Sequence, residues 1–174
     1  SWSGGGIGNG SSSRMVIYGW WRLMDDGRWT FHAQDGYQYK DEWVYAYNPY
    51  ADPKLGQKTV GWFHLDKDGY LTTGSFTDKD GKVYYLNEVS DNTLGMMLTG
   101  WQLIKGKWYY FNPTTRGTEG MMLSGWFTDP ASSLIYYLDP NGGYMHTGTT
   151  VIDGISYQFT ENASMGQPEG SLKK

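Results

Sequence analysis

The chain has 174 residues and a formal net charge of −4, with 14 Lys and Arg against 18 Asp and Glu. This length suits one domain or a short array of small repeats, and the acidic balance argues against nucleic acid or an anionic membrane surface as a partner. The absence of Cys excludes disulfide bonds, thiol catalysis and thiolate metal sites. Aromatic residues make up 17% of the chain, including 9 Trp and 15 Tyr, which indicates a folded chain with an aromatic core.

Both ends of the chain have the composition of unstructured segments. Residues 1–14 are rich in Gly and Ser, as flexible linkers are, so we expect the parent protein to continue upstream of them. Residues 167–174 are polar and predict a short, frayed tail. No stretch approaches the roughly 18 to 20 apolar residues of a membrane span. We therefore expect a soluble chain whose folded part is an array over residues 15–166.

An aromatic motif recurs irregularly over residues 18–75. The first copy runs from Gly19 through an Asp-Gly turn to a second aromatic segment at Trp29. A shorter copy begins at Trp43. We interpret residues 48–62 as the connection to the next copy, because their Asn, Gly and Trp have the spacing found in later connections.

The motif becomes regular over residues 76–148. Residues 76–100 align without a gap on residues 101–125, and a further copy with a longer first turn occupies residues 126–148. A terminal unit, residues 149–166, keeps the Asp-Gly turn and the aromatic strand that follows it. Repetition at a fixed period indicates a repeat architecture, in which each copy is one small structural unit.

Each copy combines two short segments of β-favouring aromatic residues with a turn built on Asp-Gly or Lys-Gly, the pattern of a β-hairpin. A lone hairpin is only marginally stable in water, so each one must cover the aromatic face of its neighbour. No segment has the sustained spacing of an amphipathic helix. The sequence therefore predicts an all-β fold, a solenoid or superhelix of stacked β-hairpin repeats with very little helix.

The most regular copy has a set of short motifs in a fixed order: Gly100-Trp101, the run 106–111 (Gly-Lys-Trp-Tyr-Tyr-Phe), Gly120-Met121-Met122 and Gly125-Trp126. These motifs resemble the choline-binding repeat, also called the cell-wall-binding repeat, of Gram-positive surface proteins. The resemblance covers roughly residues 18–159. It implies a left-handed superhelix of hairpins, with choline held between successive hairpins by two Trp of one unit, an aromatic residue of the next and often a Met.

Strand alternation indicates which aromatic side chains meet in such a site. Trp108 and Tyr109 point to opposite faces of their strand. The residue equivalent to Tyr109 in the next hairpin is Tyr136, which then faces back toward Trp108. The best candidate cage is therefore Trp101, Trp108 and Tyr136, with Met122 as its floor.

A second candidate cage is formed by Trp20 and Trp29 with Tyr45, where both Trp are present but the following unit is irregular. Elsewhere the pattern is broken, since Val83 stands where Trp108 stands in its own copy. We expect few working sites. Stacked hairpins also need aromatic residues simply to pack, so core packing is the alternative for each of these side chains.

A quaternary ammonium group has no hydrogen-bond donor, so its recognition relies on aromatic faces. Three faces with burial of the methyl groups give weak binding of one choline, and several sites on one array would bind a polymer that carries many cholines. An acidic chain suits the cation better than the phosphates beside it in teichoic acid. The composition thus agrees with choline or choline-substituted teichoic acid as the partner.

Other chemistry is sparse in the sequence. The Asp-Lys-Asp-Gly segments at Asp66 and Asp78 lack the closing Glu of a calcium loop and are typical of turns. The three His have no metal-ligand spacing, and no Ser motif or environment-tuned pair of carboxylates is present. We predict no metal, no cofactor and no catalytic residue in this segment.

Three function classes follow from these observations. The leading one is a non-catalytic module that anchors a secreted protein to the cell wall of a Gram-positive bacterium, as a monomer or weak dimer. The alternative is a glucan-binding or other carbohydrate-binding module, for which Gln102 and Lys105 supply polar groups beside the Trp platform. The third is a structural spacer or adhesion stalk, in which the aromatic residues only pack. A closed apolar cage favours choline, whereas hydrogen-bonding groups around a flat platform favour a sugar.

Overall fold

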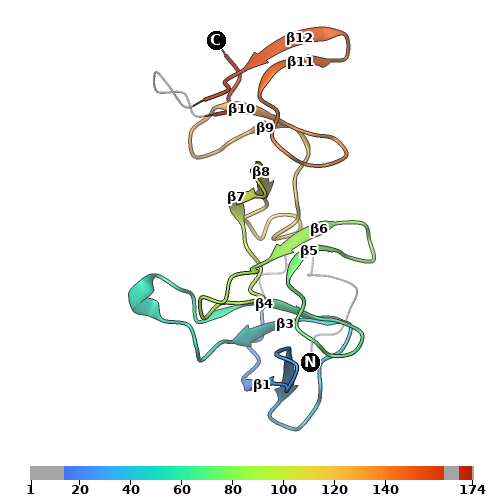
Figure 1. Cartoon of the computed structure of the whole chain (residues 1–174), viewed down its shortest axis with the longest axis vertical. Coiled ribbons are helices and arrows are strands. Elements are labelled where there is room, and N and C mark those ends of the chain that lie inside the picture. Colours follow the sequence, from blue (N-terminus) through green and yellow to red (C-terminus); the bar gives the residue numbers. More distant parts are fainter. Residues whose placement is uncertain (1–13, 163–168, 174) are drawn as a thin grey trace. The chain divides into compact units, whose positions relative to one another are not determined.

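A computed structural model describes residues 14–162 and 169–173, and these residues form an all-β fold of short antiparallel hairpins (Figure 1). Its strands are β1 (Gly19–Leu23), β2 (Trp29–Ala33), β3 (Glu42–Tyr47), β4 (Val60–Leu65), β5 (Gly74–Thr77), β6 (Val83–Leu86), β7 (Gly100–Ile104), β8 (Lys107–Phe111), β9 (Gly125–Thr128), β10 (Ile135–Leu138), β11 (Gly148–Ile152) and β12 (Ile155–Phe159). Each odd-numbered strand pairs with the strand that follows it. Within the described ranges, the helical element is a three-residue 3-10 turn, η1 (Pro53–Leu55). The predicted all-β class with repeated hairpins and very little helix is confirmed.

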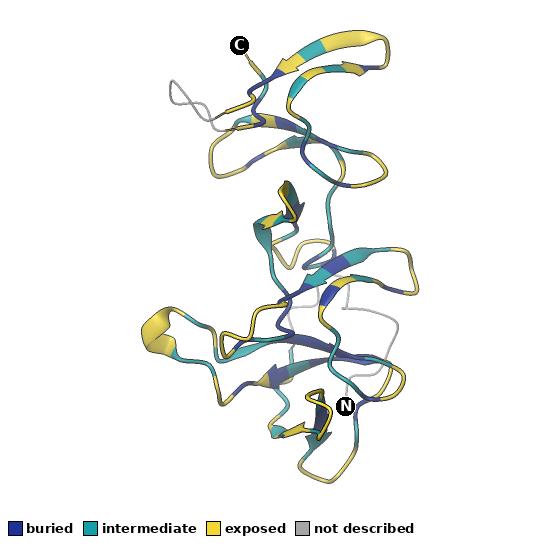
Figure 2. Cartoon of the chain, viewed as in Figure 1, coloured by how far each residue is buried: buried dark blue, intermediate teal, exposed yellow. Residues whose placement is uncertain are grey.

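The chain divides into two compact units. Unit 1 comprises residues 1–99 and 111–121, and its described part contains β1 to β6. Unit 2 comprises residues 100–110 and 122–174, which contain β7, β8 except its last residue, and β9 to β12. Each unit has a buried core rich in aromatic residues, and the buried residues are dark blue in Figure 2. Aromatic packing thus takes the place that branched aliphatic residues hold in most cores.

Two hairpins are closed by tight two-residue turns. Lys105 and Gly106 join β7 to β8 with φ angles of 49° and 82°, and Asp153 and Gly154 join β11 to β12 with 51° and 80°. Positive φ at both central residues is the geometry that matches the twist of the flanking strands, and Gly adopts it without a steric penalty. The Lys-Gly and Asp-Gly dipeptides therefore close the hairpins at the positions that the sequence indicates.

The connection after a hairpin bonds back to the preceding hairpin. The N–H groups of Leu71 and Met97 donate to the carbonyl oxygens of Trp29 and Trp62, each at 2.8 Å, in unit 1. In unit 2 the same bond joins Met145 to Trp108 at 2.8 Å and Leu172 to Ile135 at 2.7 Å. This recurring bond ties successive hairpins of each unit together, which gives the marginal single hairpins the neighbours that they need.

The irregular part of the array differs from the sequence interpretation at residues 48–59. These residues form the turn of the β3–β4 hairpin, because β3 pairs directly with β4 from Glu42↔Leu65 to Tyr47↔Val60. The turn contains η1, and Gly56 ends it with a φ of 76°. An Asn and a positive-φ Gly serve long turns and connections alike. The spacing shared with the later connections therefore does not distinguish the two.

Part of the expected polar tail is ordered into the last repeat. Ser171 is fully buried, and Leu172 bridges to Phe159 across the end of β12. The stretch 169–173 is therefore the connection of the terminal hairpin, with Leu172 in the role of the earlier Met residues. Residues 1–13 of the expected linker, and residues 163–168 at the border of the terminal unit and the tail, lie outside the described residues.

Candidate ligand-binding site

Four positions recur around successive hairpins, and we call each set an aromatic quartet. The first is an aromatic residue on the first strand of a hairpin, and the second is a residue on its second strand. The third is an aromatic residue on the second strand of the next hairpin, and the fourth is the connector residue whose N–H donates to the carbonyl of the second. The quartets are Trp21, Trp29, Phe63 and Leu71 (first); Trp43, Trp62, Tyr84 and Met97 (second); Trp101, Trp108, Tyr136 and Met145 (third); and Trp126, Ile135, Tyr157 and Leu172 (fourth).

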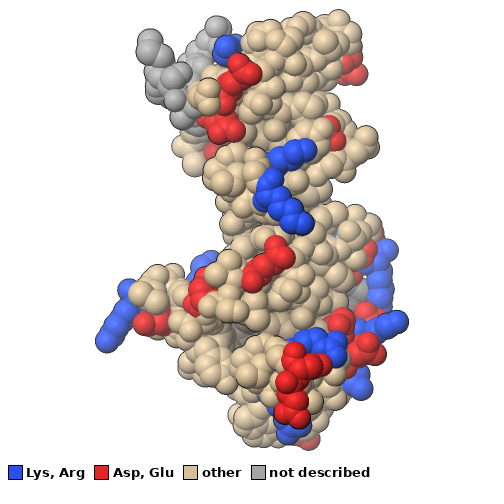
Figure 3. Space-filling model, in the orientation of Figure 1, with Lys and Arg blue, Asp and Glu red and all other residues tan. Residues whose placement is uncertain are grey.

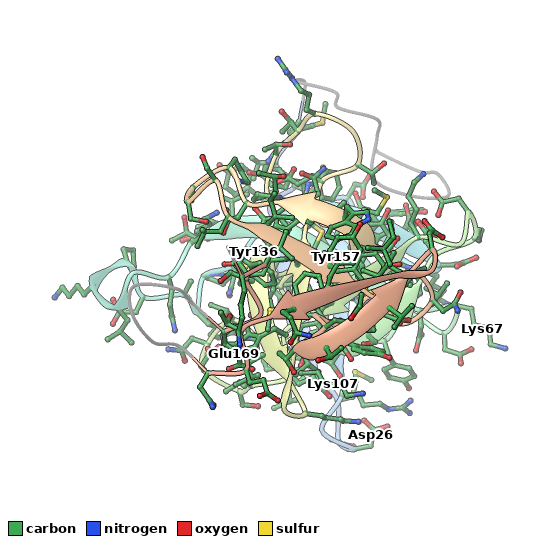
Figure 4. All side chains as sticks on the ribbon, turned by 90° about the horizontal axis from the view of Figure 1, so that it is seen from above. Asp26, Lys67, Lys107, Tyr136, Tyr157 and Glu169 are labelled. Atoms are coloured by element: carbon green, nitrogen blue, oxygen red, sulfur yellow. The ribbon has the colours of Figure 1, made fainter. Side chains whose placement is uncertain are left out.

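Ring geometry is nearly the same in all four quartets. The centroid of the first-strand Trp lies 4.8 Å from Phe63, 4.9 Å from Tyr84, 4.8 Å from Tyr136 and 4.9 Å from Tyr157, in the same order, and each pair meets edge to face. Tyr136 and Tyr157 are labelled in Figure 4. A conserved geometry of this kind within one chain shows that the repeat builds one type of aromatic corner, whose openness then depends on the other positions.

The third quartet brings together three of the four residues predicted for the first-choice cage. Trp101 and Trp108 are half-buried, and their rings stand nearly perpendicular, at 87°, with centroids 6.5 Å apart. Tyr136 is buried with 4% of its surface exposed, and burial raises the pKa of its hydroxyl, so the ring stays neutral. The Trp101 Nε1–H donates to the carboxylate of Asp129 at 3.0 Å, which fixes the indole.

Met122, the fourth predicted residue, lies against Gly143 in the next connection. The connector residue of the third quartet is Met145, which packs in one cluster with Trp101 and Trp108. The sequence signal for Met145 was its place in the connection after the next hairpin, one repeat beyond Met122. Met145 itself packs on Gly170, so a Met over a positive-φ Gly recurs along the connections.

The first quartet lines one side of a cavity of about 270 Å³, through Trp21, Trp29, Phe63 and Leu71. Both Trp are half-buried. The Trp21 Nε1–H donates to the backbone carbonyl of Tyr47 at 3.1 Å, so a neutral group orients this indole. Among the described residues that line the cavity, none is charged.

The second predicted cage is placed differently in the structure. Trp20 pairs with His32 while Trp21 pairs with Phe31, so Trp21 shares a face of the β1–β2 hairpin with Trp29 and Trp20 lies on the other face. Trp20 is 58% exposed.

Tyr45, the third member of that predicted cage, packs on Trp62 with ring centroids 5.2 Å apart, and the Arg14 guanidinium lies 5.2 Å above its ring. Among the predicted residues of this cage, only Trp29 lines the cavity of the first quartet. The sequence signal for Trp21 was its place next to Trp20, and the register of β1 on β2 selects between the two.

The second and fourth quartets differ from the first and third in opposite ways. Trp43, Trp62 and Tyr84 are 1%, 8% and 0% exposed, so the second quartet is part of the packed core. In the fourth quartet Ile135 occupies the position of the second-strand Trp, which removes one aromatic face, while Trp126 is 45% exposed. The first and third quartets are therefore the two that combine two accessible Trp with a buried aromatic ring.

Aromatic faces carry negative electrostatic potential, and a cation within about 6 Å of several ring centroids is stabilised by each. Several aromatic rings at steep angles to one another suit a cation whose charge is spread over apolar groups. On the face visible in Figure 3, Lys and Arg are interspersed with Asp and Glu and no broad basic surface is present. This surface is unsuited to a polyanion.

The described residues contain no group of three or more His, Cys, Asp and Glu placed to hold a metal ion. No helix in the described part of the chain has the length and hydrophobicity needed to span a membrane.

Comparisons with known proteins connect these quartets to a family. Residues 98–149 match the choline-binding repeat. Among curated proteins none matches the sequence. The structure is similar to choline binding protein F from Streptococcus pneumoniae, with 27% identity and a TM-score of 0.64 over 88% of this chain and 41% of that one. It is also similar to CbpJ from Streptococcus pneumoniae TIGR4, with 28% identity and a TM-score of 0.62 over 88% and 41%.

A third similar structure is the multimodular pneumococcal cell wall endolysin from phage Cp-1, complexed with choline. It has 24% identity and a TM-score of 0.50 over 94% of this chain and 39% of that one, a likeness of fold. This chain thus spans about two fifths of the length of each of the three structures.

Proposed function

We propose, on the premise that residues 98–149 are choline-binding repeats, that the chain is a non-catalytic module that binds the quaternary ammonium group of choline in its first and third aromatic quartets. The observation that carries the proposal is the pair of half-buried Trp in each of these quartets, set against an aromatic ring of the next hairpin. A trimethylammonium group requires several aromatic faces and no hydrogen-bond acceptor, and each quartet supplies three faces.

The expected affinity of one quartet is modest. Three aromatic faces at about 0.5 to 2 kcal/mol each, with burial of the methyl groups, give about −4 to −6 kcal/mol. This corresponds to dissociation constants from roughly millimolar to tens of micromolar. Two quartets on one chain bind a polymer with many cholines more strongly than either does alone, provided that the polymer reaches both. Choline-substituted teichoic acid is such a polymer.

The size and lining of the first cavity favour choline over a sugar chain. Its volume of about 270 Å³ lies just below the range of about 300 to 1,000 Å³ that holds drug-sized ligands, so it suits a small group rather than an oligosaccharide. In the third quartet, Lys105 lies in the exposed β7–β8 turn with a φ of 49°, beyond the strand that carries Trp101. The experiment below separates choline binding from carbohydrate binding.

The cellular role follows from the proposed ligand. A module of this kind holds the protein that contains it on the choline-bearing wall of a Gram-positive bacterium, outside the cell and without a covalent bond. The chain spans about two fifths of its structural relatives, which leaves room for other modules in the intact protein. We place the chemistry of that protein, if it has any, outside residues 14–162.

Titration with choline chloride, followed by Trp fluorescence and calorimetry, tests this proposal, with maltose and dextran as competing ligands. We expect a saturable response to choline with two sites per chain, no response to the sugars, and one of the two sites weakened in each of Trp29→Ala and Trp108→Ala. A response to a sugar with none to choline at tens of millimolar would show that the module belongs to the carbohydrate-binding class.

A further inference from the structure

The long turn of the β3–β4 hairpin adds a wall to the first quartet. Tyr50, within residues 48–59, lines the cavity of about 270 Å³, and its ring centroid lies 5.5 Å from that of Trp29 at an angle of 58°. The Tyr50 side chain is 53% exposed, although an aromatic ring of this size gains from burial. An exposed aromatic ring held beside a Trp at the mouth of a cavity is placed to contact a ligand.

Hydrogen bonds fix the turn against a neighbouring connection rather than leaving it free in solvent. The buried Asn48 donates from Nδ2 to the carbonyl of Asn92 at 2.7 Å, and its Oδ1 accepts from the Tyr50 N–H at 3.0 Å. Gln57 donates from Nε2 to the carbonyl of Asp91 at 2.5 Å. The position of Tyr50 is therefore set before a ligand arrives, which lowers the entropy cost of binding.

The side of the cavity formed by the connection 87–99 limits the class of ligand. Ser90, Asn92 and Leu94 line it there, so this wall is uncharged, with two polar side chains and one apolar side chain. A carboxylate or phosphate alone would meet no cationic partner among these residues, and a free ammonium would meet no carboxylate. A trimethylammonium group that carries a short, oxygen-bearing arm matches both the aromatic faces and the neutral polar rim.

The third quartet has no comparable wall among the described residues of its unit. The equivalent turn there, between β9 and β10, spans only residues 129–134, and its Asp129 is bonded to the Trp101 indole. In the first quartet the longer turn leaves the Trp21 indole bonded to a backbone carbonyl instead. The two quartets therefore share three aromatic positions, and only the first has Tyr50 beside them.

We propose that Tyr50 is a fourth aromatic face of the first quartet and makes it the tighter of the two choline sites. The proposal rests on the proposed function of the quartets and assigns it a residue from outside the repeat motif. Tyr50 and Trp29 are in contact and tilted by 58°, so a cation in the cavity lies in the corner that their rings form. This fourth ring removes more of the cation's surface from water than three faces do, and adds its own attraction. The first site then binds choline about threefold to tenfold more tightly than it would without Tyr50.

The test uses the whole chain with Trp108→Ala, which weakens the third quartet so that the tighter choline binding that remains reports the first. In this background Tyr50→Ala and Tyr50→Phe are titrated with choline chloride by calorimetry, with Tyr18→Ala as the matched control, because Tyr18 is 55% exposed and lies outside the cavity lining. Thermal midpoints without ligand verify that each variant is folded.

We expect the dissociation constant for choline to rise about threefold to tenfold in Tyr50→Ala and to change less than about twofold in Tyr50→Phe and Tyr18→Ala. Unchanged affinity in a folded Tyr50→Ala chain, with binding lost in Trp29→Ala, would refute the role of Tyr50 and leave choline binding by the quartets intact. Absence of a choline response in the unmodified chain would overturn both.

Discussion

Replacing Trp108 by Ala removes one face of the third quartet while leaving the hairpin that carries it. Trp108 is half-buried, and the bond that its carbonyl accepts from Met145 at 2.8 Å belongs to the backbone, so Ala retains it. Its ring stands perpendicular to Trp101, with centroids 6.5 Å apart, and forms one of three faces around a cation. Losing that face and admitting water is expected to cost about 1 to 3 kcal/mol of choline binding, or roughly fivefold to 150-fold in the dissociation constant of this site.

Trp43 is the matched control for this change, because it occupies the first-strand position of the buried second quartet. It is 1% exposed, and its Nε1–H donates to the Asp78 carboxylate at 3.3 Å. Trp43→Ala is expected to lower the free energy of unfolding by about 3 to 5 kcal/mol and to leave the choline affinity of the folded chain unchanged. Trp108→Ala is expected to lower the unfolding free energy by less than this.

Two measurements on each variant separate the roles: choline affinity by calorimetry and the free energy of unfolding from urea titration without ligand. If Trp108→Ala binds choline at two sites with wild-type affinity and loses as much stability as Trp43→Ala, Trp108 is a core residue. The assignment of the third quartet as a binding site would then be incorrect.

Three further outcomes follow from the structure. Burial lowers the pKa of His64 from 6.5 to about 4, so between these values the unfolded chain takes up a proton that the folded chain does not. The free energy of unfolding, measured in urea, should therefore fall by about 2 kcal/mol from pH 7 to pH 5. The variant His64→Gln should show a smaller pH dependence. Gly120 and Gly81 have φ angles of 83° and 84°, but a Cβ on Gly120 would meet the Met97 side chain whereas one on Gly81 would lie in open space. Calorimetric scans should therefore show a larger loss of folding stability for Gly120→Ala, about 2 to 4 kcal/mol, than for Gly81→Ala, about 1 to 2 kcal/mol. Equal losses of stability would contradict the packing of Met97 on Gly120. Ile135→Trp restores the missing face of the fourth quartet, so choline titration should reveal one additional weak site, and an unchanged stoichiometry would show that three faces do not suffice.

The hairpin architecture follows from local chemistry, which explains why the sequence predicts it well. Asp-Gly and Lys-Gly turns, such as Lys105-Gly106, select the positive φ angles of tight hairpins, and alternating aromatic residues select strands. The pairing of Trp101 with Tyr136 also follows from strand alternation in a regular repeat. These features depend on a few adjacent residues and on the period of two in a strand.

The features that the sequence did not reveal depend on register and on contacts between distant segments. Trp20 and Trp21 are adjacent, and only the pairing of Trp21 with Phe31 determines which of them faces the next hairpin. The role of residues 48–59 as a long turn depends on β3 pairing with β4. The same turn brings Tyr50 to Trp29, a contact that no motif in either segment indicates.

The central claim, that accessible quartets bind a quaternary ammonium cation while buried quartets only pack, is tested most directly by the indole N–H signals of the 9 Trp in an NMR titration with choline chloride. The account predicts that the signals of Trp21, Trp29, Trp101 and Trp108 shift with saturation, and that those of Trp43 and Trp62 stay in place. Shifts in response to maltose but not to choline, or choline-induced shifts confined to the buried pair, would contradict it.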